Sequence, residues 1–122
     1  MNVQIDALGD SNIAIIETDE MLLTDARSAL DLISEMYHEY GCSKIIIRKE
    51  VIPDDFFHLR TGLAGEILQK FINYQTKLAI IGEFESYHSK SLHDFIYESN
   101  KGNNIFFLPT VEEAVTRLHK LE

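Results

Sequence analysis

The sequence is poor in cysteine, proline and glycine, and it contains no long apolar run. Cys42 is the single cysteine among 122 residues, so no disulfide can form within the chain, as is usual in a reducing compartment. Two prolines and six glycines argue against a disordered chain. Residues 1–6 lack the basic and apolar segments of a secretory signal. Because no apolar run is long enough for a membrane helix, we expect a cytoplasmic protein that does not enter a membrane.

Basic residues are also scarce. Eleven Lys and Arg side chains face 20 Asp and Glu side chains, which gives a net charge of −9. Such an acidic surface repels phosphate groups, so nucleic acids and anionic membranes are disfavoured as partners. The nucleotide-binding glycine loops, the serine-nucleophile elbow and the common zinc and redox-cysteine motifs are absent from the sequence. No residue set specifies a reaction or a cofactor, and we expect no cofactor.

Strand and helix periodicities alternate along a chain of single-domain length. The Ile45–Ile47 run indicates a strand buried on both faces, which is typical of parallel sheets. We predict one α/β domain over residues 1–122, with the order β-β-α-β-α-β-α-β-α and a mixed, mainly parallel, five-stranded sheet. Ile46, Leu68 and Ile80 are expected to be fully buried. The expected strands are 3–7, 13–16, 44–48, 78–82 and 105–108, and the expected helices are 26–40, 63–73, 91–101 and 111–121.

Helical spacing predicts one apolar face on each of the first two helices. Thr24 or Asp25 is expected to cap the first helix, and Gly41 to end it. The face of the first helix comprises Ala26, Ala29, Leu30, Ile33, Met36, Tyr37 and Tyr40. The face of the second comprises Leu63, Ala64, Ile67, Leu68, Phe71 and Ile72.

The element order resembles the STAS fold, the architecture of bacterial anti-sigma-factor antagonists. In that family a strand leads to a turn reading roughly D-S-S-G-L-G and then to an apolar helix. Residues 59–65 stand at this place, and Thr61, Gly62 and Leu63 match the family's hydroxyl residue, glycine and leucine. Leu59 and Arg60 stand where the family has a preceding aspartate, in the local context that the family's kinase partner reads. The resemblance implies a STAS-like sheet with one hairpin edge.

Longer strings are similar to domain of unknown function family 4180, a group of small bacterial proteins. They are D-A-R-S-A-L-D-L at 25–32, D-F-F at 55–57, T-G-L-A-G-E-I-L-Q-K-F-I-N-Y at 61–74 and D-F-I-Y-E-S-N at 94–100. This resemblance runs nearly end to end. The family carries no established activity, so the resemblance implies no functional residues.

The turn of Arg60, Thr61 and Gly62 is the expected binding site. Open α/β sheets bind ligands at the carboxyl ends of their strands. A helix start attracts anions, and an arginine can hold one through two parallel hydrogen bonds. Gly62 would let a partner approach the backbone. In the structural alternative, Thr61 is the N-cap of the second helix and Arg60 pairs with an acidic neighbour: Asp54, Asp55 or Glu83.

Three further groups near this turn have two interpretations each. Asp54 and His58, with Asp55 nearby, could bind a divalent metal, but metal sites need three or four convergent ligands. Ser89 or Ser91 caps the third helix, and the same loop could line a polar patch together with Arg60 and Lys90. Phe56 and Phe57 are adjacent, so either one is an exposed anchor for a partner or both are buried.

We therefore expect a non-enzymatic cytoplasmic module that binds a protein partner or a small anionic ligand at the carboxyl ends of the strands. The alternative is a small-molecule enzyme or metal-dependent site around Asp54, Asp55, His58 and Arg60. A homodimer through the hairpin edge is a third possibility. The expected partner- or ligand-binding residues are Asp55, Phe56, Arg60, Thr61, Gly62, Ser89 and Lys90.

Overall fold

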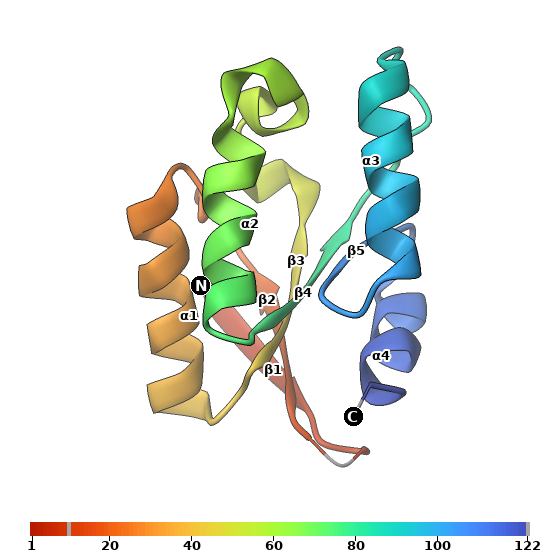
Figure 1. The fold of residues 1–122 in the computed structure, drawn as a ribbon. Helices are drawn as coiled ribbons and strands as arrows, with labels where there is room; N and C mark the ends of the chain where they lie inside the picture. The colour runs from red at the N-terminus through yellow and green to blue at the C-terminus, as the bar shows by residue number, and fades with distance from the viewer. Residues whose placement is uncertain (10, 122) are drawn as a thin grey trace.

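The structure, a computed structural model, describes residues 1–9 and 11–121 and has a five-stranded sheet (Figure 1). The strand order is β1-β2-β3-β4-β5, with β1 antiparallel to β2 and all other pairs parallel. This confirms the predicted element order and the mixed sheet. The strands are β1 (Asn2–Asp6), β2 (Ile13–Glu17), β3 (Lys44–Arg48), β4 (Lys77–Ile81) and β5 (Ile105–Leu108). The helices are α1 (Ala26–Tyr40), α2 (Leu63–Asn73), α3 (Lys90–Lys101) and α4 (Val111–His119).

The two faces of the sheet are covered unequally. Helices α1, α2 and α3 pack on one face, and α4 packs on the other. Right-handed crossovers that advance along the sheet in one direction place their helices on one side. Among the described residues no strand follows α4, so this rule does not apply to it. Among the described residues, no helix combines the length and the apolar character needed to cross a membrane.

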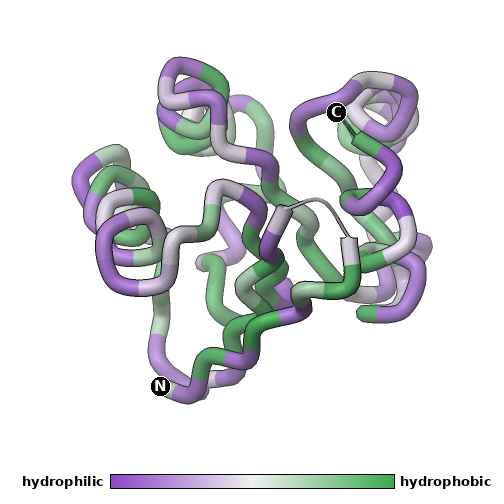
Figure 2. Tube along the Cα trace, turned by 90° about the horizontal axis from the view of Figure 1, so that it is seen from below, coloured by the Kyte–Doolittle hydropathy of each residue, from purple (hydrophilic) through white to green (hydrophobic). Residues whose placement is uncertain are grey.

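The isoleucine run of β3 supplies both cores. Ile45 and Ile47 belong to the cluster under the three helices, and Ile46 belongs to the cluster under α4. Successive strand residues point to opposite faces, so an uninterrupted apolar run is what a doubly covered strand requires. Ile46, Leu68 and Ile80 are buried, as predicted. Figure 2 shows this apolar interior between the hydrophilic outer turns.

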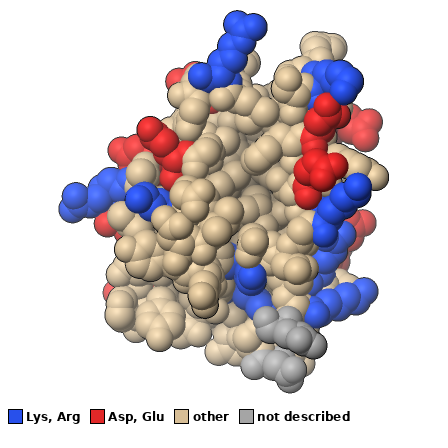
Figure 3. Space-filling model, viewed as in Figure 1, with Lys and Arg blue, Asp and Glu red and all other residues tan. Residues whose placement is uncertain are grey.

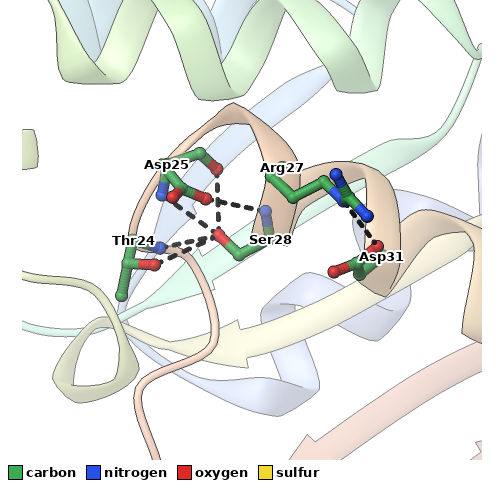
Figure 4. A network of polar contacts seen from close by, with 5 residues as sticks. All are labelled: Thr24, Asp25, Arg27, Ser28 and Asp31. Carbon is green, nitrogen blue, oxygen red and sulfur yellow. Dashed lines mark hydrogen bonds and ion pairs between the residues drawn. The ribbon is translucent and has the colours of Figure 1, made fainter.

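Side chains cap the starts of α1, α3 and α4. The Asp25 carboxylate accepts a hydrogen bond from the Ser28 amide at 2.8 Å, and the Asp25 amide donates to Ser28 Oγ at 3.0 Å (Figure 4). This reciprocal box satisfies amide groups that the first turn leaves without partners. Asp25 rather than Thr24 is therefore the cap, and Ser89 rather than Ser91 caps α3.

The predicted apolar faces of α1 and α2 are partly wrong. Tyr37 and Ile72 are 61% and 44% exposed. Tyr40 is also exposed, while Leu32, outside the predicted face, is buried. On each helix, the predicted apolar face is wider than the part of the helix surface that the sheet and the neighbouring helix cover. Tyrosine tolerates the outer position because its hydroxyl remains in water.

Two contacts from the sheet hold the C-terminal end of α4. The buried Lys44 ammonium donates to the Leu118 carbonyl at 2.6 Å and to the Leu121 carbonyl at 3.3 Å. A cation at this end of a helix also interacts favourably with the helix dipole. The Asp6 carboxylate lies 2.7 Å from His119 Nε2, which ties the β1–β2 hairpin to the same end.

Candidate functional site

The segment between β3 and α2 forms a structured cap at the carboxyl edge of the sheet. It contains three short 3₁₀ helices, η1 (Lys49–Val51), η2 (Asp54–Phe57) and η3 (Leu59–Thr61). Thr61 Oγ1 lies 2.8 Å from the Asp55 carbonyl and 2.9 Å from the His58 carbonyl, and it accepts from the Leu63 amide at 3.2 Å. One hydroxyl therefore joins η2, η3 and the start of α2.

Thr61 is not the N-cap of α2, contrary to the structural alternative. Gly62 occupies the N-cap position with φ of 78°, and no side chain caps the helix there. That conformation is readily available only to glycine. Thr61 lies one residue before the N-cap, and its hydroxyl accepts from the amide of Leu63, the first helical residue. The cap was therefore predicted one residue too early.

Arg60 is exposed and, within the described part of the chain, makes no hydrogen bond or ion pair. The prediction that it pairs with Asp54, Asp55 or Glu83 is therefore wrong. The Glu83 carboxylate instead accepts from the Ser86 amide at 3.0 Å, and hydrogen bonding to Ser86 lowers the pKa of Glu83. Arg60 therefore keeps its hydrogen-bond donors available on an otherwise fixed turn.

The phenylalanine pair is buried, so Phe56 is not a surface contact for a partner. Phe56 and Phe57 are 1% and 2% exposed. The Phe57 ring stacks on Tyr87 with centroids 5.3 Å apart. Lys49 Nζ donates to the Glu83 carbonyl at 2.9 Å and lies 5.0 Å from the Tyr87 ring centroid. These contacts join the β3–α2 segment to the β4–α3 loop because each loop covers apolar surface of the other.

Ser89 and Lys90 already have structural partners. Ser89 Oγ accepts from the Leu92 amide at 3.2 Å. Lys90 pairs with Asp94 at 2.8 Å on the exposed side of α3, and this hydrogen bond raises the pKa of Lys90. Figure 1 shows the starts of α2 and α3 standing apart at the top of the view. Ser89 and Lys90 are therefore engaged by groups of α3 itself, and their part in a shared polar patch with Arg60 stays a prediction.

The proposed metal ligands do not converge. Among the residues that the structure describes, no group of three or more His, Cys, Asp or Glu side chains could hold a metal ion. Asp54, Asp55 and His58 are exposed on η2 and the residue after it. Cys42 is buried in the core under the three helices, and burial raises the pKa of its thiol.

A hollow of about 380 Å³ lies at the carboxyl edge, but not at the expected turn. Met21, which lines it, is 55% exposed and comes from the β2–α1 loop. Arg60, Thr61 and Gly62 do not line this hollow. Its lining residues are Met21, Lys49, Glu50, Ile52, Pro53, Asp54, Phe57 and Tyr87.

Sequence reasoning missed a larger groove, of about 680 Å³, beside α1 and the α2–β4 turn. Tyr37 and Tyr74 line it and are about 60% exposed. Figure 3 shows an uncharged surface over the lower ends of α1 and α2. Periodicity assigned Tyr37 to the core, so it gave no signal of a groove. The lining residues are Leu30, Asp31, Ile33, Ser34, Tyr37, His38, Ser43, Tyr74, Gln75 and Thr76.

Comparison with protein families agrees with the sequence strings described above. A sequence model described as Domain of unknown function (DUF4180) matches residues 8–118. The chain belongs to this family. The DUF4180 match spans all described elements from β2 to β5 and nearly all of α4, and so includes the β3–α2 segment.

Two further comparisons add little. No curated protein matches the chain. A Thermotoga maritima crystal structure, provisionally described as an anti-sigma factor antagonist, is similar with 16% identity and a TM-score of 0.45. The similarity covers 93% of this chain and 92% of that one. With a TM-score below 0.5, this similarity supports no conclusion about function.

Proposed function

We propose that this DUF4180 protein is a non-enzymatic cytoplasmic regulatory module, and that Arg60 binds an acidic group of a partner protein. The alternative is that the same turn binds a small anionic ligand. The observation that carries the proposal is the exposed guanidinium of Arg60 without a partner in the described chain. Arginines with structural roles in such acidic proteins are expected to be paired, because carboxylates are abundant.

The surroundings of Arg60 favour recognition of an anion. The amide groups at the start of α2 have no side-chain cap apart from the Thr61 bond to Leu63. Unpaired amides and the positive end of the helix dipole both attract negative charge. Apart from Gly62 and its immediate surroundings in the chain, no heavy atom of the described residues lies within 4 Å of the position where a Gly62 side chain would begin. A carboxylate or phosphate could therefore reach Arg60 and this backbone together.

A rigid support makes the site suitable for binding. Thr61 fixes the turn to η2, and the buried Phe57 fixes η2 to the loop before α3. A backbone turn that is already fixed loses less conformational freedom when a partner binds. The metal-dependent alternative lacks support among the described residues, because Asp54, Asp55 and His58 belong to no group that could hold a metal ion.

The test compares two exposed arginines. Arg60→Ala should weaken binding of the partner captured from the native bacterium at least tenfold, about 1.4 kcal/mol, and leave the melting temperature nearly unchanged. Arg27→Ala is the matched control, because Arg27 is exposed on α1 and forms only a long surface pair with Asp31. Binding would be measured by calorimetry and folding by circular dichroism on the same preparations.

The two ligand types give different results. For a small anion, titration with inorganic phosphate should shift the amide resonances of Gly62 and Leu63, and Arg60→Ala should abolish these shifts. If neither partner binding nor the phosphate shifts depend on Arg60, or if Arg60→Ala unfolds the protein, the proposal is wrong.

A further inference from the structure

The two edges of the sheet differ in whether they can accept another strand. At the β5 edge, the Asn100 side chain donates to the Phe107 carbonyl at 3.0 Å and accepts from the Phe107 amide at 2.8 Å. An asparagine amide thus takes the place of a neighbouring strand. Arg117 donates to the Asn100 carbonyl at 2.8 Å, which fixes this position. The β5 edge is therefore closed at its centre.

The β1 edge is open. β1 pairs only with β2, and no hydrogen bond between described residues reaches its outer side. Figure 2 shows the N-terminal segment along the outer margin of the molecule, with no helix outside it. An unpaired strand edge presents a row of backbone donors and acceptors to any second strand.

We propose that β1 of one molecule pairs antiparallel with β1 of a second copy, with Gln4 on the two-fold axis. In this register Gln4 faces Gln4, Val3 faces Ile5, and Asn2 faces Asp6 of the second copy. An antiparallel pairing of a segment with itself satisfies the two-fold symmetry of a closed dimer. The two sheets would join into one continuous sheet.

The side chains of β1 suit this register. Val3 and Ile5 pair with Ile16 and Ala14 of β2, which point to the three-helix face. Val3 is half-buried and Ile5 is 36% exposed, so four apolar side chains from two copies would cover one another. Cross-strand apolar pairs of this kind stabilise sheets. The polar Asn2, Gln4 and Asp6 lie on the opposite face.

Charge does not prevent the pairing, although the chain is acidic overall. Asp6 is the one charged residue of β1, and it lies opposite the neutral Asn2 of the second copy. Its carboxylate is already engaged with His119 at 2.7 Å and with the Leu8 amide at 3.2 Å. No two like charges of β1 therefore face each other. Because a single pair of five-residue strands buries little surface, we expect a weak dimer with a dissociation constant in the micromolar range or above.

Charge substitutions at Gln4 test both the dimer and its register. Gln4 is exposed, so a charge there should leave the monomer folded. Gln4→Lys or Gln4→Glu places two like charges opposite each other on the axis, which destabilises a strand pair. Each variant alone should dimerise at least tenfold more weakly than the unaltered protein. An equimolar mixture of the two variants should recover dimer, because lysine then faces glutamate.

Sedimentation velocity over a concentration series, on protein without a purification tag, would measure the association. Leu8→Lys is the control, because Leu8 is 92% exposed in the hairpin turn and lies outside the pairing. It should leave the dimer unchanged, and circular dichroism would check that all variants fold. The proposal is overturned if the unaltered protein is monomeric at every concentration, if the Gln4 variants dimerise normally, or if mixing them restores nothing.

Discussion

At the scale of single residues, a few polar side chains join separate structural elements, within one turn for Thr61 and across the sequence for Lys44 and Asp6. Thr61 binds three neighbouring backbone groups, Lys44 holds the end of α4, and Asp6 binds both its own turn and His119. Each of these residues has an ordinary place in the sequence pattern. Their roles depend on partners that only the folded chain brings near, so the sequence could not assign them.

Asp6 provides a prediction about acid stability. The hydrogen bond to His119, followed by that from the Leu8 amide, lowers the pKa of Asp6 from its ordinary value of 3.8. A carboxyl group with a lowered pKa in the folded state stabilises the protein above the unfolded pKa. That contribution is lost as the pH falls through the folded pKa. We therefore expect Asp6→Asn to lower the free energy of unfolding at neutral pH. Below about pH 4, the free energy of unfolding of this variant should fall less with decreasing pH than that of the unaltered protein.

Urea denaturation at a series of pH values would measure this difference. Asp19→Asn changes an exposed carboxylate in the β2–α1 loop and should leave the pH profile close to that of the unaltered protein. An Asp6→Asn profile that runs parallel to the unaltered one through the acid range would contradict this account of the Asp6–His119 contact.

At the scale of elements, two isoleucines of α2 allow a matched comparison. Ile67 is fully buried and Ile72 is 44% exposed. Ile67→Ala leaves a cavity in the core and should cost about 2–5 kcal/mol of unfolding free energy. Ile72→Ala removes the same atoms from a surface position and should cost less than about 1 kcal/mol. Chemical denaturation monitored by circular dichroism gives both values, and equal losses would mean that the orientation of α2 is wrong.

The same two residues illustrate how far periodicity predicts a helix. Helical spacing placed Ile67 and Ile72 on one face, and it located the helix correctly. Spacing does not report how wide a strip the neighbours cover, so Ile72 and Tyr37 were wrongly assigned to the core. Strand boundaries were predicted within about one residue, because β-branched runs between turn signals are strong local patterns.

The candidate site was less predictable than the fold. The position of the Arg60 turn follows from the strand–turn–helix order, and Arg60 is exposed in the structure. The bonds of Ser89 and Lys90 are local, to residues three and four positions later, whereas the burial of Phe56 depends on packing against segments that lie apart in the sequence. Local sequence contains no information about such contacts. The role of the Arg60 turn in binding stays a prediction.

At the scale of the whole molecule, the two sheet edges lead to a prediction about aggregation. Asn100→Ala should remove both bonds to Phe107 and open the β5 edge. We expect faster, concentration-dependent aggregation, measured by light scattering and thioflavin fluorescence. Asn103→Ala is the control, because Asn103 is an exposed asparagine next to β5 with no side-chain bond in the described chain.

A second variant separates edge-to-edge growth from simple unfolding. Adding Gln4→Lys to Asn100→Ala should suppress the growth, because it blocks the β1 edge without restoring the lost bonds. If the double variant aggregates as fast as Asn100→Ala, the aggregates form from unfolded chains and the edge account fails.

The Asn100 side chain also determines how many edges of the molecule can associate, which polymer chemistry calls the functionality of a unit. A unit with one reactive end can form only pairs, whereas a unit with two reactive ends adds further units without limit. By occupying the centre of the β5 edge, Asn100 makes the protein monofunctional and acts as a chain terminator within each molecule. One amide group would then decide whether this sheet yields particles of fixed size or open-ended fibres.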